Sequence, residues 1–146
     1  MKTFVLAGAL ALAIVSGETM AACSGNGWNL LPGTASGNAA SITQDVAGQM
    51  VCATSGSDKW QEEHRSGGEL WDYKLGPTST VDPTEKVGNW SIDSTNNQIT
   101  HSYGAGGSYT YYVWKQGNNY CFSTSNSSAA AGIQATIKAM GSACPP

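Results

Sequence analysis

Charged residues are scarce in this sequence: Asp, Glu, Lys and Arg make up 12% of its 146 residues, and the formal net charge is −3 at pH 7. The basic residues are few and scattered, so the chain offers no basic patch, and we exclude nucleic acid as a partner. After residue 15 no apolar run is long enough to cross a bilayer. The sequence also lacks CxxC pairs and Cys/His ligand spacing, so we expect no metal and no cofactor.

Motifs of the common catalytic and nucleotide-binding families are missing as well. The sequence contains no Gly-x-Ser-x-Gly elbow, no His-Glu-x-x-His pair, no phosphate-binding glycine loop and no dinucleotide fingerprint. Its glycines fall where turns are expected. These absences favour a protein that is not an enzyme.

The first 21 residues have the composition of an export signal. Lys2 supplies a positive charge, residues 4–15 form an apolar run too short to span a bilayer, and Thr19 and Ala21 are small residues before a cleavage point. We predict a signal peptide over residues 1–21 and a secreted or periplasmic protein. A second interpretation treats residues 20–23 as a degenerate lipobox that would leave Cys23 as a lipid-anchored N-terminus.

The cysteine count favours disulfides over a lipid anchor, because a lipidated Cys23 would leave an odd number. An exported location is oxidising, so two structural disulfides are expected. One predicted pairing joins Cys52 to Cys121 across the seam of a closed sheet and Cys23 to Cys144 between the termini. The sequence-local alternative joins Cys23 to Cys52 and Cys121 to Cys144.

Gly, Ser, Thr and Asn are abundant, and the aromatic residues are mainly Trp and Tyr, a composition typical of β-strands joined by many turns. Alternating or β-rich segments occur at residues 49–53, 60–65, 69–75, 87–92, 98–103, 108–115 and 120–123. We predict a single mainly β domain over residues 49–146. Its strands form an antiparallel up-and-down meander that closes into a small barrel or a strongly curved sheet. Residues 22–48 are expected to form an irregular N-terminal arm.

The C-terminal part of the chain changes character. A serine pair at residues 127–128 suits a helix cap, and Ile133, Ile137 and Met140 recur at helical spacing before a glycine. This pattern predicts one C-terminal α-helix over residues 128–141, packed on the sheet.

The densest group of aromatic and ionisable side chains lies at residues 60–75, which the pattern predicts to be a β-hairpin. Gly67 and Gly68 suit a two-residue turn, which sets His64 opposite Trp71 and Glu62 opposite Tyr73. Because strand side chains alternate, one face of this hairpin is then aromatic with an embedded carboxylate and imidazole. That face carries Trp60, Glu62, His64, Trp71, Tyr73 and Leu75.

Residues 87–92 and 98–103 form the clearest strand pair, with a tight turn at Asn96 and Asn97 that sets Ile92 opposite His101 and Trp90 opposite Tyr103. The face that they share holds Trp90, Ile92, Ile99, His101 and Tyr103. A buried carboxylate costs free energy unless it is paired, and burial raises its pKa. Our candidate ligand-binding residues are therefore Glu62, His64, Trp71, Tyr73, Trp90, His101 and Tyr103. The alternative is a polar cluster that only stabilises the core.

These features predict an exported, non-enzymatic protein that binds a small molecule, a carbohydrate or a protein. A second hypothesis is a structural subunit of an extracellular assembly, in which residues 109–114 form an exposed edge and accept a strand from a neighbouring copy, so that the protein self-associates. A third is a hydrolase that uses Glu62 and His64 as its acid/base pair.

The succession of strands and the residues Gly88-Asn89-Trp90 resemble the Gly-x-Trp of lipocalin and avidin barrels. In those families the motif belongs to the first strand, whereas here it lies in the middle of the chain. The resemblance therefore implies a barrel architecture and assigns no functional residue.

Overall fold

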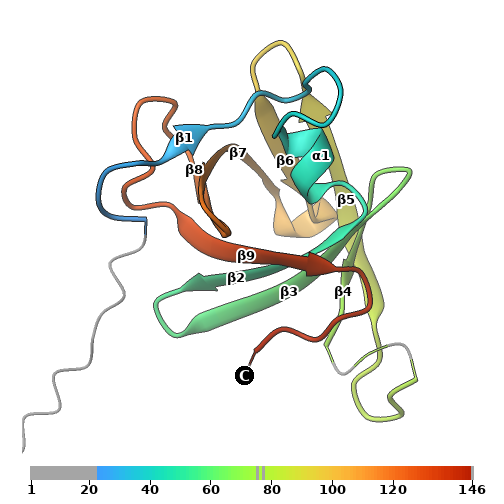
Figure 1. The fold of residues 1–146 in the computed structure, drawn as a ribbon. Coiled ribbons are helices and arrows are strands. Elements are labelled where there is room, and N and C mark those ends of the chain that lie inside the picture. The colour runs from blue at the N-terminus through green and yellow to red at the C-terminus, as the bar shows by residue number, and fades with distance from the viewer. Residues whose placement is uncertain (1–22, 75, 77, 146) are drawn as a thin grey trace, which may run out of the picture.

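The computed structural model describes residues 23–74, 76 and 78–145, so the expected signal peptide and Leu75 lie outside the described residues. Within these residues one antiparallel sheet of nine strands accounts for most of the regular structure (Figure 1). The strands are β1 Asn29–Leu30, β2 Gln49–Ser55, β3 Asp58–Arg65, β4 Glu69–Asp72, β5 Glu85–Asp93, β6 Gln98–Ser102, β7 Ser108–Gln116, β8 Asn119–Ser123 and β9 Ile133–Ala139. A short helix, α1 (Ile42–Val46), and a 3-10 turn, η1 (Gly104–Gly106), complete the described part of the chain.

The sheet closes into a barrel of eight strands, β2 to β9, and β1 adds to β7 outside that ring. Strands β2 to β8 pair with their sequence neighbours, and β9 then pairs with both β8 and β2. The predicted antiparallel meander and its closure are confirmed. Strand β7 is paired with β6 and β8, and β1 of the same chain adds to it, so residues 109–114 are not the free edge that the assembly hypothesis expected.

The predicted C-terminal helix over residues 128–141 is wrong, because residues 133–139 form β9. Ile133 and Ile137 are four residues apart, a spacing that places them on one face of a strand as well as of a helix. Both pack against the barrel core, with Ala135 between them only 2% exposed. Strand pairing to β2 and β8 satisfies the backbone of both neighbours, which a helix on the outside would leave unpaired.

Both predicted disulfide pairings are also wrong: the bonds join Cys23 to Cys121 and Cys52 to Cys144. The seam prediction assumed that β2 and β8 are neighbours. Strand β9 lies between them, so Cys52 is opposite Thr136 instead of a β8 residue. Because the sulfur of Cys23 is used in a disulfide, the thioether of the lipobox interpretation is excluded.

The arm at residues 23–48 seals one end of the barrel through α1. Ser41 caps this helix by accepting a hydrogen bond from the Gln44 backbone N–H, at 3.1 Å. Ile42 and Val46 are completely buried and belong to the main hydrophobic core. We call this the closed end.

The opposite end, at which β2, β4, β6 and β8 finish, is the open end. The described connections that surround it are residues 56–57, 73–74, 76, 78–84, 103–107 and 124–132. Figure 1 shows that residues 78–84, before β5, extend well beyond the strands at this end.

Candidate functional site

The loop between β3 and β4 has three residues, Ser66 to Gly68, instead of the predicted two. Arg65 therefore faces Glu69, and His64 faces Leu70. Gly67 and Gly68 both have positive φ, at 89° and 83°, which favours glycine. The Gly68 carbonyl accepts a hydrogen bond from the Trp90 backbone N–H at 2.8 Å, so the loop is extended to reach β5.

This one-residue change moves two predicted site residues, Trp71 and Tyr73, to the outside of the barrel. The Arg65 guanidinium lies 4.0 Å from the centre of the Trp71 ring, a cation–π contact. The Tyr73 hydroxyl donates to the carbonyl of Gly141 in the C-terminal segment, at 3.0 Å. Asp72 takes the inward position opposite Glu62.

The predicted shared face of β5 and β6 is confirmed, although the register differs by two residues. Trp90 lies opposite His101 and Ile92 opposite Ile99, because the turn occupies residues 94–97. A shift of two keeps every side chain on its predicted face. The indole N–H of Trp90 donates to the Arg65 carbonyl at 3.0 Å, which ties β5 to the loop after β3.

Two buried histidines meet in the middle of the barrel. The Nε2 atoms of His64 and His101 are 2.9 Å apart, and His64 Nδ1 lies 3.3 Å from the Glu62 carbonyl oxygen. A carbonyl only accepts, so His64 carries its proton on Nδ1, and His101 Nε2–H donates to His64 Nε2. Burial lowers the pKa of His64 to about 3, reinforced by the neighbouring His101, and burial lowers that of His101 to about 4.

This tautomer leaves His101 Nδ1 as a hydrogen-bond acceptor. Among the described residues it has no hydrogen-bond partner, although His101 is only 6% exposed. Every fully buried side-chain nitrogen and oxygen in the described part of the chain does have a partner. The Nδ1 atom is therefore in contact with free space, and His101 lines a small hollow at the open end of the barrel.

Glu62 lies on the same inward face of β3 as His64, and its carboxylate accepts from one phenol. The Tyr103 hydroxyl is 2.8 Å and 3.0 Å from the two carboxylate oxygens. Burial raises the pKa of Glu62 to about 7; the bond from Tyr103 opposes this shift and the charge of Asp72 adds to it. Burial and the Glu62 charge in turn raise the pKa of Tyr103.

The hydrolase hypothesis required Glu62 and His64 to act as a pair, and the structure does not arrange them so. His64 contacts the backbone of Glu62 and uses its other nitrogen on His101. His64 is also completely buried. The two side chains therefore do not form a carboxylate–imidazole couple.

Two spaces in the open half of the barrel share Trp60 and Glu62 in their linings. The smaller one, which we call the hollow, has a volume of about 50 Å³ and is lined by Val51, Ala53, Trp60, Glu62, His101, Tyr111, Phe122 and Ile133. The larger one, which we call the cleft, has a volume of about 560 Å³. Its lining includes Trp60, Glu62, Asp72, Lys74, Asp82, Tyr103 and Tyr109. Trp60 and Glu62 line both, so they stand at the boundary.

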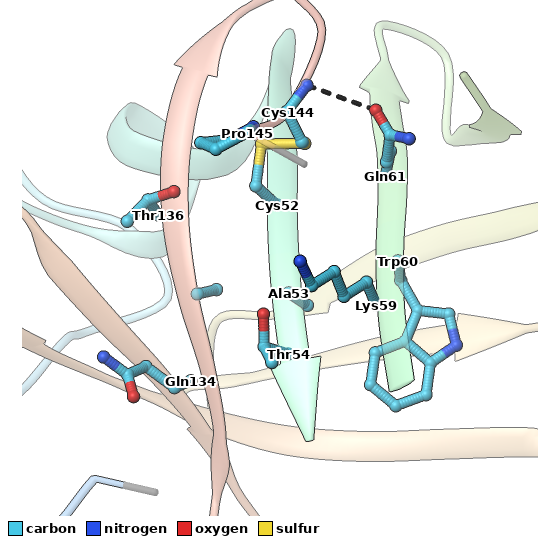
Figure 2. A pocket seen from close by; sticks show the side chains of 11 residues that line it. Cys52, Ala53, Thr54, Lys59, Trp60, Gln61, Gln134, Thr136, Cys144 and Pro145 are labelled. Atoms are coloured by element: carbon cyan, nitrogen blue, oxygen red, sulfur yellow. Dashed lines mark hydrogen bonds between the residues drawn. A yellow bond between two sulfur atoms is a disulfide. The ribbon is translucent and has the colours of Figure 1, made fainter. Parts of the chain in front are cut away.

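A third depression lies on the outer face of β9, β2 and β3, beside the C-terminal segment (Figure 2). Its volume is about 340 Å³. Figure 2 shows Cys144 and Pro145 over Cys52, with the Cys144 backbone N–H donating to Gln61 Oε1 at 3.1 Å. Its lining is largely apolar and includes the amide and hydroxyl side chains of Thr54, Gln61, Gln134 and Thr136, with the Lys59 side chain across it. Trp60 forms its rim as well.

Of the predicted site residues, the structure brings together Glu62, His64, Trp90, His101 and Tyr103 and separates Trp71 and Tyr73 from them. The ring of Trp90 lies 5.5 Å from that of His64. Sequence reasoning missed Asp72, Tyr109 and Tyr111, and it placed Trp60 on the correct face without including it in the site. Trp60 and Glu62 are two residues apart and share a strand face, which was a sufficient signal for including Trp60 in the site. The inward position of Asp72 could be predicted only with the correct length of the loop between β3 and β4.

Among residues 23–74, 76 and 78–145, no three His, Cys, Asp or Glu side chains lie close enough to hold a metal ion. No helix in the described part of the chain has the length and apolar character needed to cross a membrane. Comparison of the chain with protein-family models, with curated proteins and with solved structures found no match.

Proposed function

We propose that this is an exported binding protein that takes a small molecule into the open end of its barrel. The observation that carries the proposal is the cleft of about 560 Å³, which shares Trp60 and Glu62 with the adjacent hollow. Small-molecule sites typically have volumes of about 300–1,000 Å³ and combine aromatic walls with a few polar groups. Two disulfides support an oxidising location outside the cytoplasm.

The exposed aromatic side chains at this end support binding over a purely structural role. Trp60 is 39% exposed and Tyr109 49% exposed, although both are large and partly apolar. Aromatic rings left at the rim of a cavity offer large contact areas to a ligand at low cost in conformational entropy. The barrel core is formed by other residues, such as Ile99 and Val113, which are completely buried.

A ligand screen by thermal shift on the oxidised protein tests this proposal. A ligand of the cleft binds only the folded state, so at about 100 times its Kd it stabilises the protein by about 2.7 kcal/mol. We expect the shift to be lost in Trp60→Ala and kept in Trp71→Ala, which removes the same side chain from the outer face. Ligand shifts that survive Trp60→Ala and disappear in Trp71→Ala would contradict the proposed site.

Gel filtration separates this proposal from an assembly subunit. A binding protein of this kind is expected to elute as a single species of the size of one chain, whereas an assembly subunit gives ordered species of high mass. A high-mass form whose interface covers Trp60 and Tyr109 would replace the small-molecule proposal by the second hypothesis.

A further inference from the structure

Three residues that line the hollow, Glu62, His101 and Tyr111, carry hydrogen-bond acceptors that are not fully used within the described residues. His101 Nδ1 is an acceptor without a partner among the described residues, and its ring is held in that state by the bond from His101 to His64. The Glu62 carboxylate receives one O–H, from Tyr103, which leaves most of its lone pairs free. The Tyr111 hydroxyl makes no hydrogen bond with a described residue and can accept as well as donate.

The charges near the hollow also favour a positively charged ligand, because the carboxylates there lack cationic partners among the residues that the structure describes. In the described part of the chain neither Glu62 nor Asp72 forms an ion pair, whereas Lys74 at the mouth of the cleft is held by Asp82 and Glu85 at 3.4 Å and 3.5 Å. A buried carboxylate without a cation costs free energy. A cation that enters from the cleft would remove that cost.

We propose that the open end recognises a primary ammonium group on an aromatic small molecule, with the ammonium in the hollow between Glu62, His101 Nδ1 and Tyr111. This proposal rests on the proposed function and names its ligand class. An ammonium carries three N–H donors and one positive charge, which matches three acceptor groups and one unpaired carboxylate. The rings of Trp60, Tyr111 and Phe122 also line the hollow and favour a cation by their π-electron faces.

The volumes of the two spaces indicate which part of the ligand each can hold, a small head group in the hollow and a larger body in the cleft. A cavity needs about 10–15 Å³ of such volume to hold one water and about 150 Å³ to hold a benzene ring, so the hollow of about 50 Å³ admits a head group of a few atoms and no ring. The cleft is about ten times larger and carries Trp60, Tyr103 and Tyr109 on its walls. An aromatic ring linked to the ammonium by a short alkyl chain fits this division.

Isothermal titration calorimetry with 2-phenylethylamine and with 2-phenylethanol tests the proposal on the oxidised protein at about pH 8. The two probes have the same shape, but the alcohol lacks the charge and two of the donors. We expect the amine to bind at least about tenfold more tightly than the alcohol, as for a charge-assisted hydrogen bond in a desolvated site. Equal affinity, or no binding of the amine, overturns the inference.

Substitution of Glu62 separates the role of the charge from that of the cavity. Glu62→Gln keeps the shape and is expected to weaken amine binding at least about tenfold while leaving the alcohol within about threefold. Glu69→Gln is the matched control, because Glu69 is bonded to Lys86 and Trp71 on the outer face. Amine binding that survives Glu62→Gln overturns the proposed ammonium site.

The pH dependence provides a second, independent measurement. Glu62 is ionised above its pKa of about 7, so amine affinity is expected to rise between about pH 5.5 and about pH 8 in the native protein and to stay flat in Glu62→Gln. His101, whose pKa is lowered to about 4, remains neutral over this range, and the charged groups at the mouth, Asp72, Asp82 and Lys74, are the same in both proteins, so the difference between the two profiles isolates Glu62. A native profile that is as flat as that of the variant overturns the inference.

The outcomes distinguish the ligand class from the function itself. If amine and alcohol bind equally and both depend on Trp60, the open end binds small molecules and only the ammonium inference fails. If neither probe binds and the ligand screen shows no shift that depends on Trp60, both fail together.

Discussion

The two ends of this barrel are finished in opposite ways. At the closed end, α1 inserts Ile42 and Val46 into the core, and Asp45 binds Lys115 at 2.7 Å and the Tyr120 hydroxyl at 3.0 Å. At the open end, aromatic side chains stand partly exposed around a cleft. The closed end thus satisfies its apolar and polar groups within the chain, and the open end leaves both kinds of group available.

The difference between the two ends shows that residues for stability and residues for binding can occupy opposite halves of one small barrel. A barrel of eight strands has an interior just wide enough to be filled by side chains or to hold one small ligand. Here the half near α1 is filled and the half near Glu62 is not. We therefore expect substitutions at the closed end to change mainly the free energy of unfolding and those at the open end to change mainly ligand affinity.

The largest expected effect is at the closed end. Ile42→Ala removes a completely buried side chain from the core and is expected to lower the free energy of unfolding by about 3 kcal/mol. Urea denaturation monitored by circular dichroism measures it. A loss below about 1 kcal/mol would show that α1 does not seal the barrel in solution.

The next effect is pH-dependent and belongs to the open end. The pKa of Glu62 is raised from 4.5 to about 7, so its stabilising contribution is full below about pH 4.5 and is lost as the pH rises through about 7. Glu62→Gln is therefore expected to be more stable than the native protein at about pH 8, by on the order of 2 kcal/mol, and equally stable at about pH 4.

Comparing the native protein with Glu62→Gln separates the effect of the Glu62 carboxyl on stability from the effect of the histidines. The lowered pKa values of His64 and His101 reduce stability as the pH falls below 6.5, which is the opposite sign, but they do so in both proteins. Thermal or urea unfolding of both proteins at the two pH values measures the difference in their free energies of unfolding. A stability difference that does not vary with pH would show that Glu62 is not buried.

A smaller effect is expected for the ion pair of the closed end. Asp45→Asn removes the negative charge that faces Lys115. Because the Asp45 side chain is only 13% exposed, the substitution is expected to lower the free energy of unfolding by about 1 kcal/mol. Asp58→Asn, at the exposed start of β3, is the control and should leave the urea midpoint unchanged. Equal effects at both positions would remove the distinction between the ends.

The smallest effect on stability is expected for Tyr109→Ala at the open end. Tyr109 is 49% exposed and its hydroxyl bonds only the nearby Gly106 carbonyl, so about 0.5 kcal/mol or less should be lost. Tyr120→Ala is the matched change at the closed end, where the side chain is 7% exposed, and is expected to cost about 3 kcal/mol. If the two tyrosines cost the same in urea denaturation, the open end contributes to the core after all.

The sequence predicted the barrel and most of its interior because strand alternation has a period of two. Trp90, His101 and Tyr103 were assigned to the correct face even though their register differed by two residues. The hairpin after His64 failed for the same physical reason, since an error of one residue in a loop reverses every face that follows it. In the structure Gly68 accepts a hydrogen bond from Trp90 of β5, a contact between distant residues that local sequence does not contain.

Predicting the disulfides and the ligand spaces required the correct assignment of one distant element, β9. Ile133 and Ile137 fit a helix and a strand equally well, and only the unpaired edges of β2 and β8 decide between them. With β9 assigned to a helix, Cys52 and Cys121 seemed adjacent. Both faces of β7 carry aromatic side chains, Tyr109 and Tyr111 on one and Tyr112 and Trp114 on the other, so alternation alone did not show that Tyr111 faces inward.

The position of β9 has a consequence for the order in which the protein is made. Strand β2, near the front of the barrel, obtains its second partner only when residues 133–139 have been synthesised, and Cys52 obtains its partner later still. Until then one edge of β2 is bare and prone to pair with other chains. The barrel therefore closes only after residues 133–139 have been synthesised and have paired with β2 and β8.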